Sequence, residues 1–539
     1  MNFSNFADKN LVNNRLKWYN KLIYTESVRI MVVKSISFGI NGIDGYIVEV
    51  EASTTRGMPR FDLVGLPDAA VKESKDRVTS AMKNCGLRIT SNHITFNLAP
   101  ADIKKEGPIY DLPITVCMML LSGHIVTKTD DCGFIGELSL SGELRSINGV
   151  LPMVIKAREA GLKRIIVPPQ NAEEAAVVDG IDVYTVRDII ELKNYLNREK
   201  ALTPVKPKPY IAASADSYIP DFSQVMGQSE AKRALEIAAA GSHNILLIGP
   251  PGSGKSMLAK RVPSILPDMS FEEMIDATKI HSIAGTLHGD GLVRIRPFRA
   301  PHHSVTAVGL GGGGTNGIRP GEVSLAHHGV LFLDELPEFT RNALEVLRQP
   351  IEDGEITITR AGQTCTYPCR IMVVAAMNPC PCGFFGDDTH HCTCSPQKIR
   401  RYLNRISGPL LDRFDIHLEV PRVQFEELRA NTPAEASADI KKRVNAAREM
   451  QRRRFEGSDT LSNAAINPAQ LRKFCVIDKE AEDTLRFAFE KFGMTARAYD
   501  RVLKVARTIA DLAESEIIRQ EHVFEAVQYR SLDRKYWEN

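Results

Sequence analysis

The sequence predicts an α/β protein in which two α/β units are followed by an all-α region. Strand-like and helix-like runs alternate in residues 31–198 and again in residues 222–425. Residues 426–539 show helical patterns and few strand patterns. A segment with several prolines, residues 199–221, separates the two α/β units and is predicted to be a linker. Alternating strands and helices of this kind favour parallel sheets covered by helices.

The composition is that of an ordinary globular protein. Of the 539 residues, 43% are hydrophobic and 25% are charged, which excludes a disordered chain or a fibre. Lys and Arg number 68 and Asp and Glu number 66, so only local basic surfaces could bind nucleic acid. The longest apolar run, Leu112–Leu121, is about half of the ~20 residues that a membrane span requires. Because no signal peptide is visible, we expect a cytoplasmic protein without a membrane partner.

The elements of the first α/β unit follow from its periodicity. Residues 1–30 are polar and Asn-rich, and they are either a tail or a segment before a translation start at Met31; the sequence favours neither. From Met31 onward, apolar residues alternate with a period near two in strands and near 3.6 in helices. The predicted strands are 45–53, 93–100, 133–144 and 164–169, and the predicted helices are 69–84, 112–122 and 149–161.

A phosphate-binding loop opens the second α/β unit. The string GPPGSGKS, residues 249–256, matches G-x-x-x-x-G-K-[ST] and lies between a buried-strand run and a helical run. Glycines in such a loop let backbone N–H groups surround phosphates at a helix N-terminus. Lys255 is expected to contact the β- and γ-phosphates of ATP, and Ser256 to ligate Mg²⁺. The predicted ATP-binding residues are Gly249, Gly252, Gly254, Lys255 and Ser256.

Polar side chains follow two further buried strands. Val330–Leu333 ends in Asp334 and Glu335, and residues 370–376 lead to Asn378. Ligands bind at the carboxyl ends of parallel strands, so Asp334 is predicted to hold Mg²⁺ and Glu335 to polarise the attacking water. Asn378 would orient that water or contact the γ-phosphate. The alternative for Asn378 is a turn-forming residue before proline.

Long strings around these motifs resemble the AAA+ ATPases, within them the magnesium chelatase-like branch, and specifically the YifB/ComM family. The resemblance spans nearly all of residues 31–535 and is strongest in residues 299–339, 375–387, 405–421 and 495–512. It implies a Lon-protease-like α/β domain, then an AAA+ P-loop α/β core, then an all-α C-terminal lid domain.

The same resemblance implies roles for residues that spacing alone could not assign. Asn378 corresponds to sensor 1. Arg413, in LLDRFD, is similar to the arginine finger that enters a neighbour's ATP site in a ring. Arg497, in TARAYDR, is similar to sensor 2, with Arg501 as the alternative. Each of these arginines could instead form a surface salt bridge.

Two segments of the core resemble elements that face the central pore of related ring motors. Residues 299–328 would be the helix-2 insert and residues 353–369 the pre-sensor hairpin. Independent support comes from the glycine-rich run in the first segment and the strand-like alternation in the second. Arg299, His302 and His303 are then candidate substrate contacts, although the two histidines could equally be structural.

Six of the ten cysteines fall between Cys365 and Cys394. Four of them form two C-x-C pairs that could close a tetrahedral zinc site: Cys380, Cys382, Cys392 and Cys394. The usual C-x-x-C spacing is missing, so the alternative of reduced thiols without a metal stays open. Family proteins resemble this chain in carrying such cysteines directly after sensor 1.

The Lon-like resemblance carries a second implication. The nucleophile and lysine positions of the Lon fold align with Ile109 and Leu151, and both residues are apolar. A Ser–Lys pair is therefore missing, and we expect no peptidase activity.

The sequence thus predicts an ATP hydrolase, and the resemblance points to a hexameric DNA motor that acts as a helicase in branch migration during natural transformation. Single-stranded or branched DNA is the expected partner. One alternative is the motor subunit of a metal chelatase, and another is a protein-remodelling ATPase. Local basic residues that could bind phosphates, or could merely be solvated, are Lys398, Arg400, Arg401, Arg405 and Arg452–Arg454.

Overall fold

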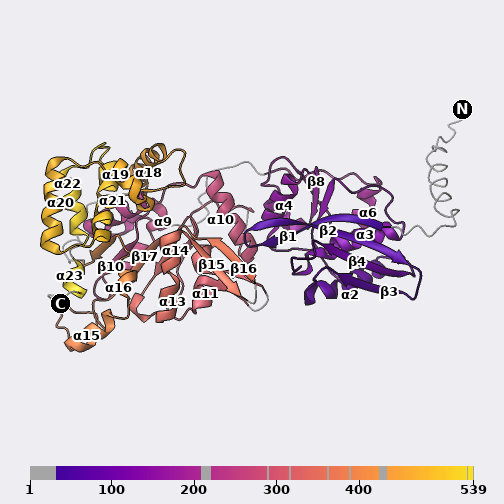
Figure 1. Cartoon of the computed structure of the whole chain (residues 1–539), viewed down its shortest axis with the longest axis horizontal. Helices are drawn as coiled ribbons and strands as arrows, with labels where there is room; N and C mark the ends of the chain where they lie inside the picture. The colour runs from indigo at the N-terminus through magenta and orange to yellow at the C-terminus, as the bar shows by residue number, and fades with distance from the viewer. Residues whose placement is uncertain are drawn as a thin grey trace.

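The computed structural model describes residues 32–207, 220–287, 291–314, 317–360, 363–387, 390–423, 434–530 and 532–537. The predictions for residues 1–30 and for most of the linker lie outside the described residues, as do residues 361–362 of the predicted hairpin segment 353–369. Figure 1 shows the first α/β unit, in indigo and purple, at one end of the molecule and the second unit with the C-terminal helices at the other.

The first unit is built on a seven-stranded mixed sheet in the order β3-β4-β2-β1-β5-β8-β9. The pairs β1–β2 and β2–β4 are antiparallel, whereas β3–β4, β1–β5, β5–β8 and β8–β9 are parallel. The strands are β1 (Val32–Asn41), β2 (Asp44–Thr55), β3 (Arg60–Val64), β4 (His93–Ala99), β5 (Cys132–Phe134), β8 (Arg164–Val167) and β9 (Asp182–Thr185).

The three predicted helices of this unit are confirmed as α2 (Ala69–Asn84), α3 (Asp111–Leu121) and α4 (Val150–Glu159). Two further helices, α5 (Ala172–Ala175) and α6 (Ile189–Leu196), were not predicted. The apolar run at 112–121 forms most of α3, which is almost entirely buried as a core helix. None of the helices that the structure describes is long and apolar enough to cross a bilayer.

The single strand predicted over residues 133–144 is wrong. The chain there forms three short strands, β5, β6 (Glu137–Leu138) and β7 (Leu144–Arg145), of which β6 and β7 pair with each other. Gly142 has a φ of +90°, a left-handed conformation that turns the chain between β6 and β7.

The second unit contains a five-stranded parallel sheet in the order β11-β14-β17-β10-β18. The strands are β11 (Phe298–Arg299), β14 (Val330–Leu333), β17 (Met372–Met377), β10 (Ile245–Ile248) and β18 (Ile416–Glu419). Every residue of β10, β14 and β17 is buried, as expected for strands covered on both faces. Their carboxyl ends meet at one edge of the sheet, and this edge holds the predicted nucleotide site.

Helices and two small hairpins complete this unit. The predicted strand at 355–360 is confirmed as β15 (Glu355–Arg360), which pairs with β16 (Gln363–Pro368). The second hairpin joins β12 (Gly312–Gly313) and β13 (Arg319–Pro320). The helices are α7 (Ser229–Gly241), α8 (Lys255–Ala259), α9 (Val262–Ile265), α10 (Phe271–Ala284), α11 (Ala307–Gly311), α12 (Glu322–Leu325), α13 (Arg341–Val346), α14 (Arg348–Asp353), α15 (Pro396–Leu403) and α16 (Gly408–Leu411).

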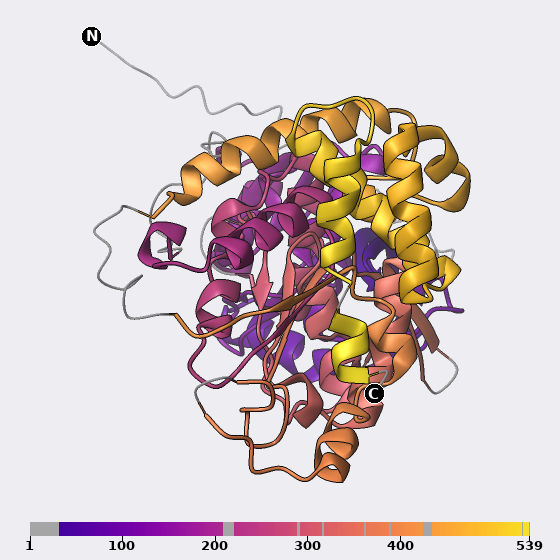
Figure 2. The same cartoon turned by 90° about the vertical axis from the view of Figure 1, so that its left-hand side faces the viewer.

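The C-terminal region is helical in its described part. Figure 2 shows its longer helices, in orange and yellow, gathered on one side of the sheet. A buried apolar cluster joins them to α7 and to the strands of the second unit. The helices are α18 (Ser437–Arg454), α19 (Pro468–Phe474), α20 (Lys479–Phe492), α21 (Ala496–Leu512), α22 (Gln520–Gln528) and α23 (Leu532–Trp537).

Helices α4 and α10 connect the two α/β units. The Gly149 N–H donates to the Ser282 carbonyl at 3.1 Å, and the Ser282 hydroxyl donates to the Glu174 carboxylate. Glu174 also accepts from the Leu151 N–H at 2.8 Å, and burial raises the pKa of its carboxyl. Leu151 is buried, and Ile109 packs against the same apolar cluster. The position at which the Lon resemblance expects a lysine therefore belongs to the contact between the units.

Candidate nucleotide-binding site

The P-loop begins where β10 ends and continues into α8, as its sequence predicts. Gly252 and Gly254 have φ values of +79° and +89°, which side chains with a Cβ rarely adopt. At Gly249 an added Cβ would lie 2.2 Å from the Val420 carbonyl oxygen, so the close approach of the two segments requires glycine. The glycines of the motif thus shape a loop whose N–H groups lead into the N-terminus of α8.

Lys255 lies at the centre of this loop. Its Nζ donates to the carbonyl oxygens of Gly249 and Pro250, at 2.7 and 2.9 Å, and to Asn378 Oδ1 at 3.3 Å. Burial lowers the pKa of Lys255 to about 8, although the nearby Asp334 carboxylate acts in the opposite direction. The structure therefore brings the ends of β10 and β17 together around one ammonium group.

Ser256 and Asp334 lie next to each other across the same site. The Ser256 hydroxyl donates to Asp334 Oδ2 at 2.6 Å. Hydroxyl and carboxylate oxygens are the ligands that Mg²⁺ prefers, and here they converge from α8 and from the end of β14. These two residues fit a magnesium ion bound together with nucleotide phosphates.

Glu335 is exposed and has a φ of +53°, an uncommon conformation for a residue with a side chain. Its backbone N–H donates to Asp334 Oδ1 at 3.0 Å. Its carboxylate lies 3.1 Å from His303 Nδ1. The contact with His303 fixes the position of this carboxylate just beyond the carboxyl end of β14.

The sequence does not predict the contact between His303 and Glu335, because it leaves a pore role and a structural role for His303 equally open. The parallel pairing of Phe298 with Val330 brings the chain after β11 out at the same edge as the carboxyl end of β14. Because β11 has only two residues, its pattern was too short to recognise. Of the other two pore candidates, Arg299 pairs with Glu322 at 2.6 Å, and His302 contacts the Ser304 hydroxyl at 2.9 Å.

The three arginines with predicted catalytic roles differ in their surroundings. Arg413 is buried, forms an ion pair with Glu352 and donates to the Pro409 carbonyl oxygen at 2.6 Å. Arg501 donates to the Phe414 carbonyl oxygen at 3.2 Å and lies 3.7 Å from Asp415. Arg497, in the first turn of α21, is exposed. Arg501 thus has structural partners, whereas the exposed Arg497 remains the predicted sensor 2.

The four cysteines of the C-x-C pairs form one cluster. The Sγ atoms of Cys380, Cys382 and Cys392 lie 3.3 to 3.7 Å apart, and Cys394 is within 4.8 Å of the same group. This arrangement suits a tetrahedral Cys₄ zinc site. The loop around Gly383 also packs on the P-loop, since an added Cβ there would lie 2.4 Å from Pro251.

The predicted basic residues separate into two groups. Arg405 pairs with Glu338, and Arg454 turns inward to pair with the buried Asp511. Arg452 and Arg453 are more than three-quarters exposed and share Glu449. The exposed cations of α15 are Lys398, Arg400 and Arg401. Arg454 therefore acts in a folding contact, whereas Arg405 is exposed and lies at the surface with the others.

The fold and this site define a P-loop ATPase of the AAA+ type. The family pattern described as magnesium chelatase, subunit ChlI, matches residues 221–428. Patterns for subunit ChlI of Mg-chelatase and for the C-terminal part of that subunit match residues 50–171 and 434–530.

Individual proteins are similar over almost the whole chain. The protein YifB of Escherichia coli (strain K12) is 44% identical over 495 residues, which cover 92% of this chain and 96% of YifB. The competence protein ComM of Haemophilus influenzae is 42% identical over 498 residues, again 92% of this chain and 96% of the relative. The chain belongs to the YifB/ComM family of magnesium chelatase-like AAA+ ATPases.

A more distant similarity concerns part of the chain only. The Lon protease of Citrifermentans bemidjiense is 29% identical over 208 residues, which are 36% of this chain and 25% of that protease. Together with the mixed α/β sheet of the first unit, this similarity supports a Lon-like domain in front of the ATPase core.

Proposed function

We propose that the chain is an ATP-driven DNA motor that works as a hexameric ring in the cytoplasm. The observation that carries the proposal is the convergence of Lys255, Ser256, Asp334 and Asn378 at one sheet edge in a relative of a competence protein. In this account ATP binds to the P-loop, with Mg²⁺ between the phosphates, Ser256 and Asp334.

Each polar residue has a separate task in hydrolysis. Glu335 accepts a hydrogen bond from the attacking water and polarises it, and Asn378 orients that water beside the γ-phosphate. Lys255 and the loop N–H groups stabilise the charge that develops on the phosphate oxygens. His303 keeps Glu335 in place before the nucleotide arrives. Arg413 acts on the site of a neighbouring subunit, and Arg497 contacts the nucleotide from the lid.

The proposal is tested by the rate of ATP hydrolysis with and without single-stranded and forked DNA at moderate salt. We expect DNA to raise the rate strongly and Lys255→Ala to abolish hydrolysis. Absence of DNA binding by the active ATPase would contradict a DNA motor.

A motor subunit of a metal chelatase is the second candidate, and the magnesium chelatase description of the matching family favours it. ATP hydrolysis in that case would drive a partner that inserts Mg²⁺ into a porphyrin. The ATPase would then be indifferent to DNA, so the same measurement separates the two candidates.

A further inference from the structure

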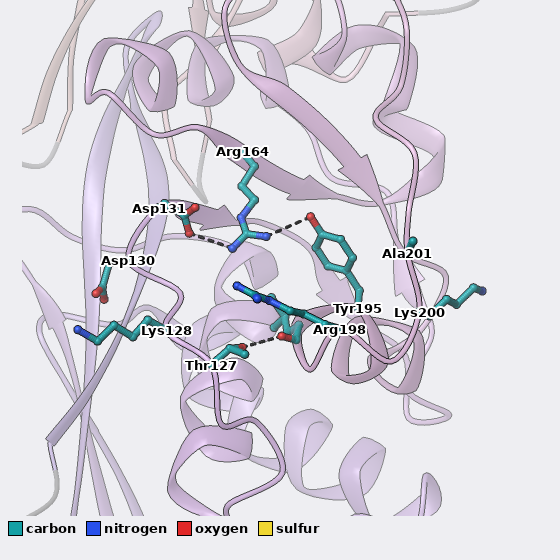
Figure 3. A pocket seen from close by; sticks show the side chains of 10 residues that line it. Thr127, Lys128, Asp130, Asp131, Arg164, Tyr195, Arg198, Lys200 and Ala201 are labelled. Atoms are coloured by element: carbon teal, nitrogen blue, oxygen red, sulfur yellow. Dashed lines mark hydrogen bonds and ion pairs between the residues drawn. The ribbon is translucent and has the colours of Figure 1, made fainter. Parts of the chain in front are cut away.

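A pocket in the first domain, far in the sequence from the P-loop, has no role in the ATPase described above. It has a volume of about 690 Å³ and is lined by the loop between α3 and β5, the start of β8, the end of α6 and the segment that follows α6. Figure 3 shows Arg164, Arg198 and Tyr195 around its centre, with Lys128 and Asp130 at one side. A volume of this size is typical of sites for small molecules, about 300–1,000 Å³.

The charges in this pocket favour an anion. Four cations line it against two carboxylates, Asp130 and Asp131. Asp131 is already engaged with Arg164 at 3.0 Å, and Lys200 pairs with Glu191 at 2.7 Å. Within the described part of the chain, Lys128 and Arg198 have no ion pair. Lys128 and Arg198 can therefore bind a ligand, and Asp130 is the one carboxylate of the pocket that opposes an anion there.

Arg198 is held in the pocket at a conformational cost. It directly follows the C-cap residue of α6 and has a φ of +62°. Glycine, or sometimes asparagine, normally occupies this left-handed position after a helix. The left-handed backbone is unfavourable for any residue with a Cβ, whereas a cation at the C-terminus of a helix is favoured by the helix dipole. A residue with this backbone beside a pocket is a pointer to function.

The walls of the pocket are fixed before any ligand binds. The Thr127 hydroxyl donates to the Leu196 carbonyl oxygen at 2.6 Å, and Asn197 donates to the His124 carbonyl oxygen at 2.8 Å. These bonds tie the α3–β5 loop to the end of α6. Arg164 donates to the Tyr195 hydroxyl at 3.2 Å, which orients its guanidinium group. Preorganised walls reduce the entropy that a ligand must lose.

We propose that this pocket binds a nucleoside phosphate, either free or as part of a DNA strand. Lys128 and Arg198 would hold the phosphate, since guanidinium and ammonium groups form strong charge-assisted hydrogen bonds with phosphate oxygens. Arg164 would add its positive charge, and the Tyr195 side chain, which also lines the pocket, would contact the base or sugar. The site is separate from the P-loop, so it does not depend on the proposed motor function.

The test uses the full chain with its P-loop saturated by ADP and Mg²⁺, and thymidine 3′,5′-bisphosphate as the probe. Binding is measured by titration calorimetry. We expect the natural sequence to bind the probe, and Arg198→Glu and Lys128→Glu each to weaken binding by about tenfold or more. Lys163→Glu is the matched control, because Lys163 is an exposed cation beside Arg164 that does not line the pocket, and it should bind the probe normally.

Two results would overturn the proposal: no binding of the probe at millimolar concentration, or unchanged binding in both pocket variants. Thermal unfolding of each variant shows whether it is folded, and the use of two independent variants keeps the test valid if one of them fails to fold.

Competition with single-stranded oligothymidine then identifies the source of the phosphate. Displacement of the probe indicates a DNA strand, and lack of displacement indicates a free nucleotide; both outcomes agree with a phosphate-binding pocket. A chain that binds the probe but has an ATPase indifferent to DNA would contradict the motor proposal alone.

Discussion

At the scale of single residues, the ammonium group of Lys255 makes nucleotide binding depend on pH. Without nucleotide, burial lowers its pKa to about 8, and bound phosphates must raise that pKa because they favour the charged ammonium. The affinity for nucleotide is then highest below the pKa that Lys255 has without nucleotide, and it declines as pH rises above that pKa. We predict that the Kd for ADP increases between pH 7.5 and 9, approaching tenfold per unit at the upper end.

The control for this prediction is Lys255→Arg, measured in the same buffers. A guanidinium group stays protonated over this range, so the variant should bind more weakly but with little pH dependence. An equal pH dependence in the arginine variant would show that another group is responsible.

Some contacts of single residues cannot be predicted from the sequence. Arg452, Arg453 and Arg454 are one run in the sequence, yet the helical period turns Arg454 toward Asp511 and leaves its neighbours in solvent. Lys255 and Asp334 could be predicted because their motifs specify both chemistry and position. His303 could not, because its partner Glu335 is adjacent only through the pairing of β11 with β14.

At the scale of elements, the loop that carries Cys380, Cys382, Cys392 and Cys394 can be tested by metal analysis. Its four thiols surround one point, and its Gly383 region packs on the P-loop. We predict about one zinc per chain in protein purified without chelators, by metal analysis. Cys382→Ser together with Cys392→Ser should lose the zinc and weaken nucleotide binding, because the P-loop loses the support of the loop beside it.

Cys475→Ser is the matched control for the cysteine variant. Cys475 is buried in the helical region and lies outside the cluster, so this variant should keep its zinc. Protein that is folded and free of zinc before any substitution would contradict the zinc site and favour reduced thiols.

At the scale of the whole molecule, the order of domains could be predicted, whereas their contacts could not. The motifs and the proline-rich segment separate the units in the sequence. The hydrogen bonds among Gly149, Ser282 and Glu174 join residues that no local pattern relates. The partner of Arg413 is a similar case, because Glu352 lies on a different element and is half exposed.

Assembly should release Arg413 from Glu352 if Arg413 serves a neighbouring site. We predict that Arg413→Ala binds ADP normally and loses hydrolysis by a factor of about 10³ or more. Mixing Arg413→Ala with Lys255→Ala should restore activity, because some interfaces then combine an intact P-loop with an intact Arg413. If the mixture stays inactive although both variants assemble, Arg413 acts within its own chain.

Branch migration of a synthetic four-way DNA junction is the measurement that tests the motor most directly. We predict ATP-dependent migration by the natural sequence and none by Glu335→Gln. This variant should still bind both ATP and DNA, because only the polarisation of water is lost. Migration by Glu335→Gln at the natural rate, or its absence in a natural chain that hydrolyses ATP and binds the junction, would contradict the account.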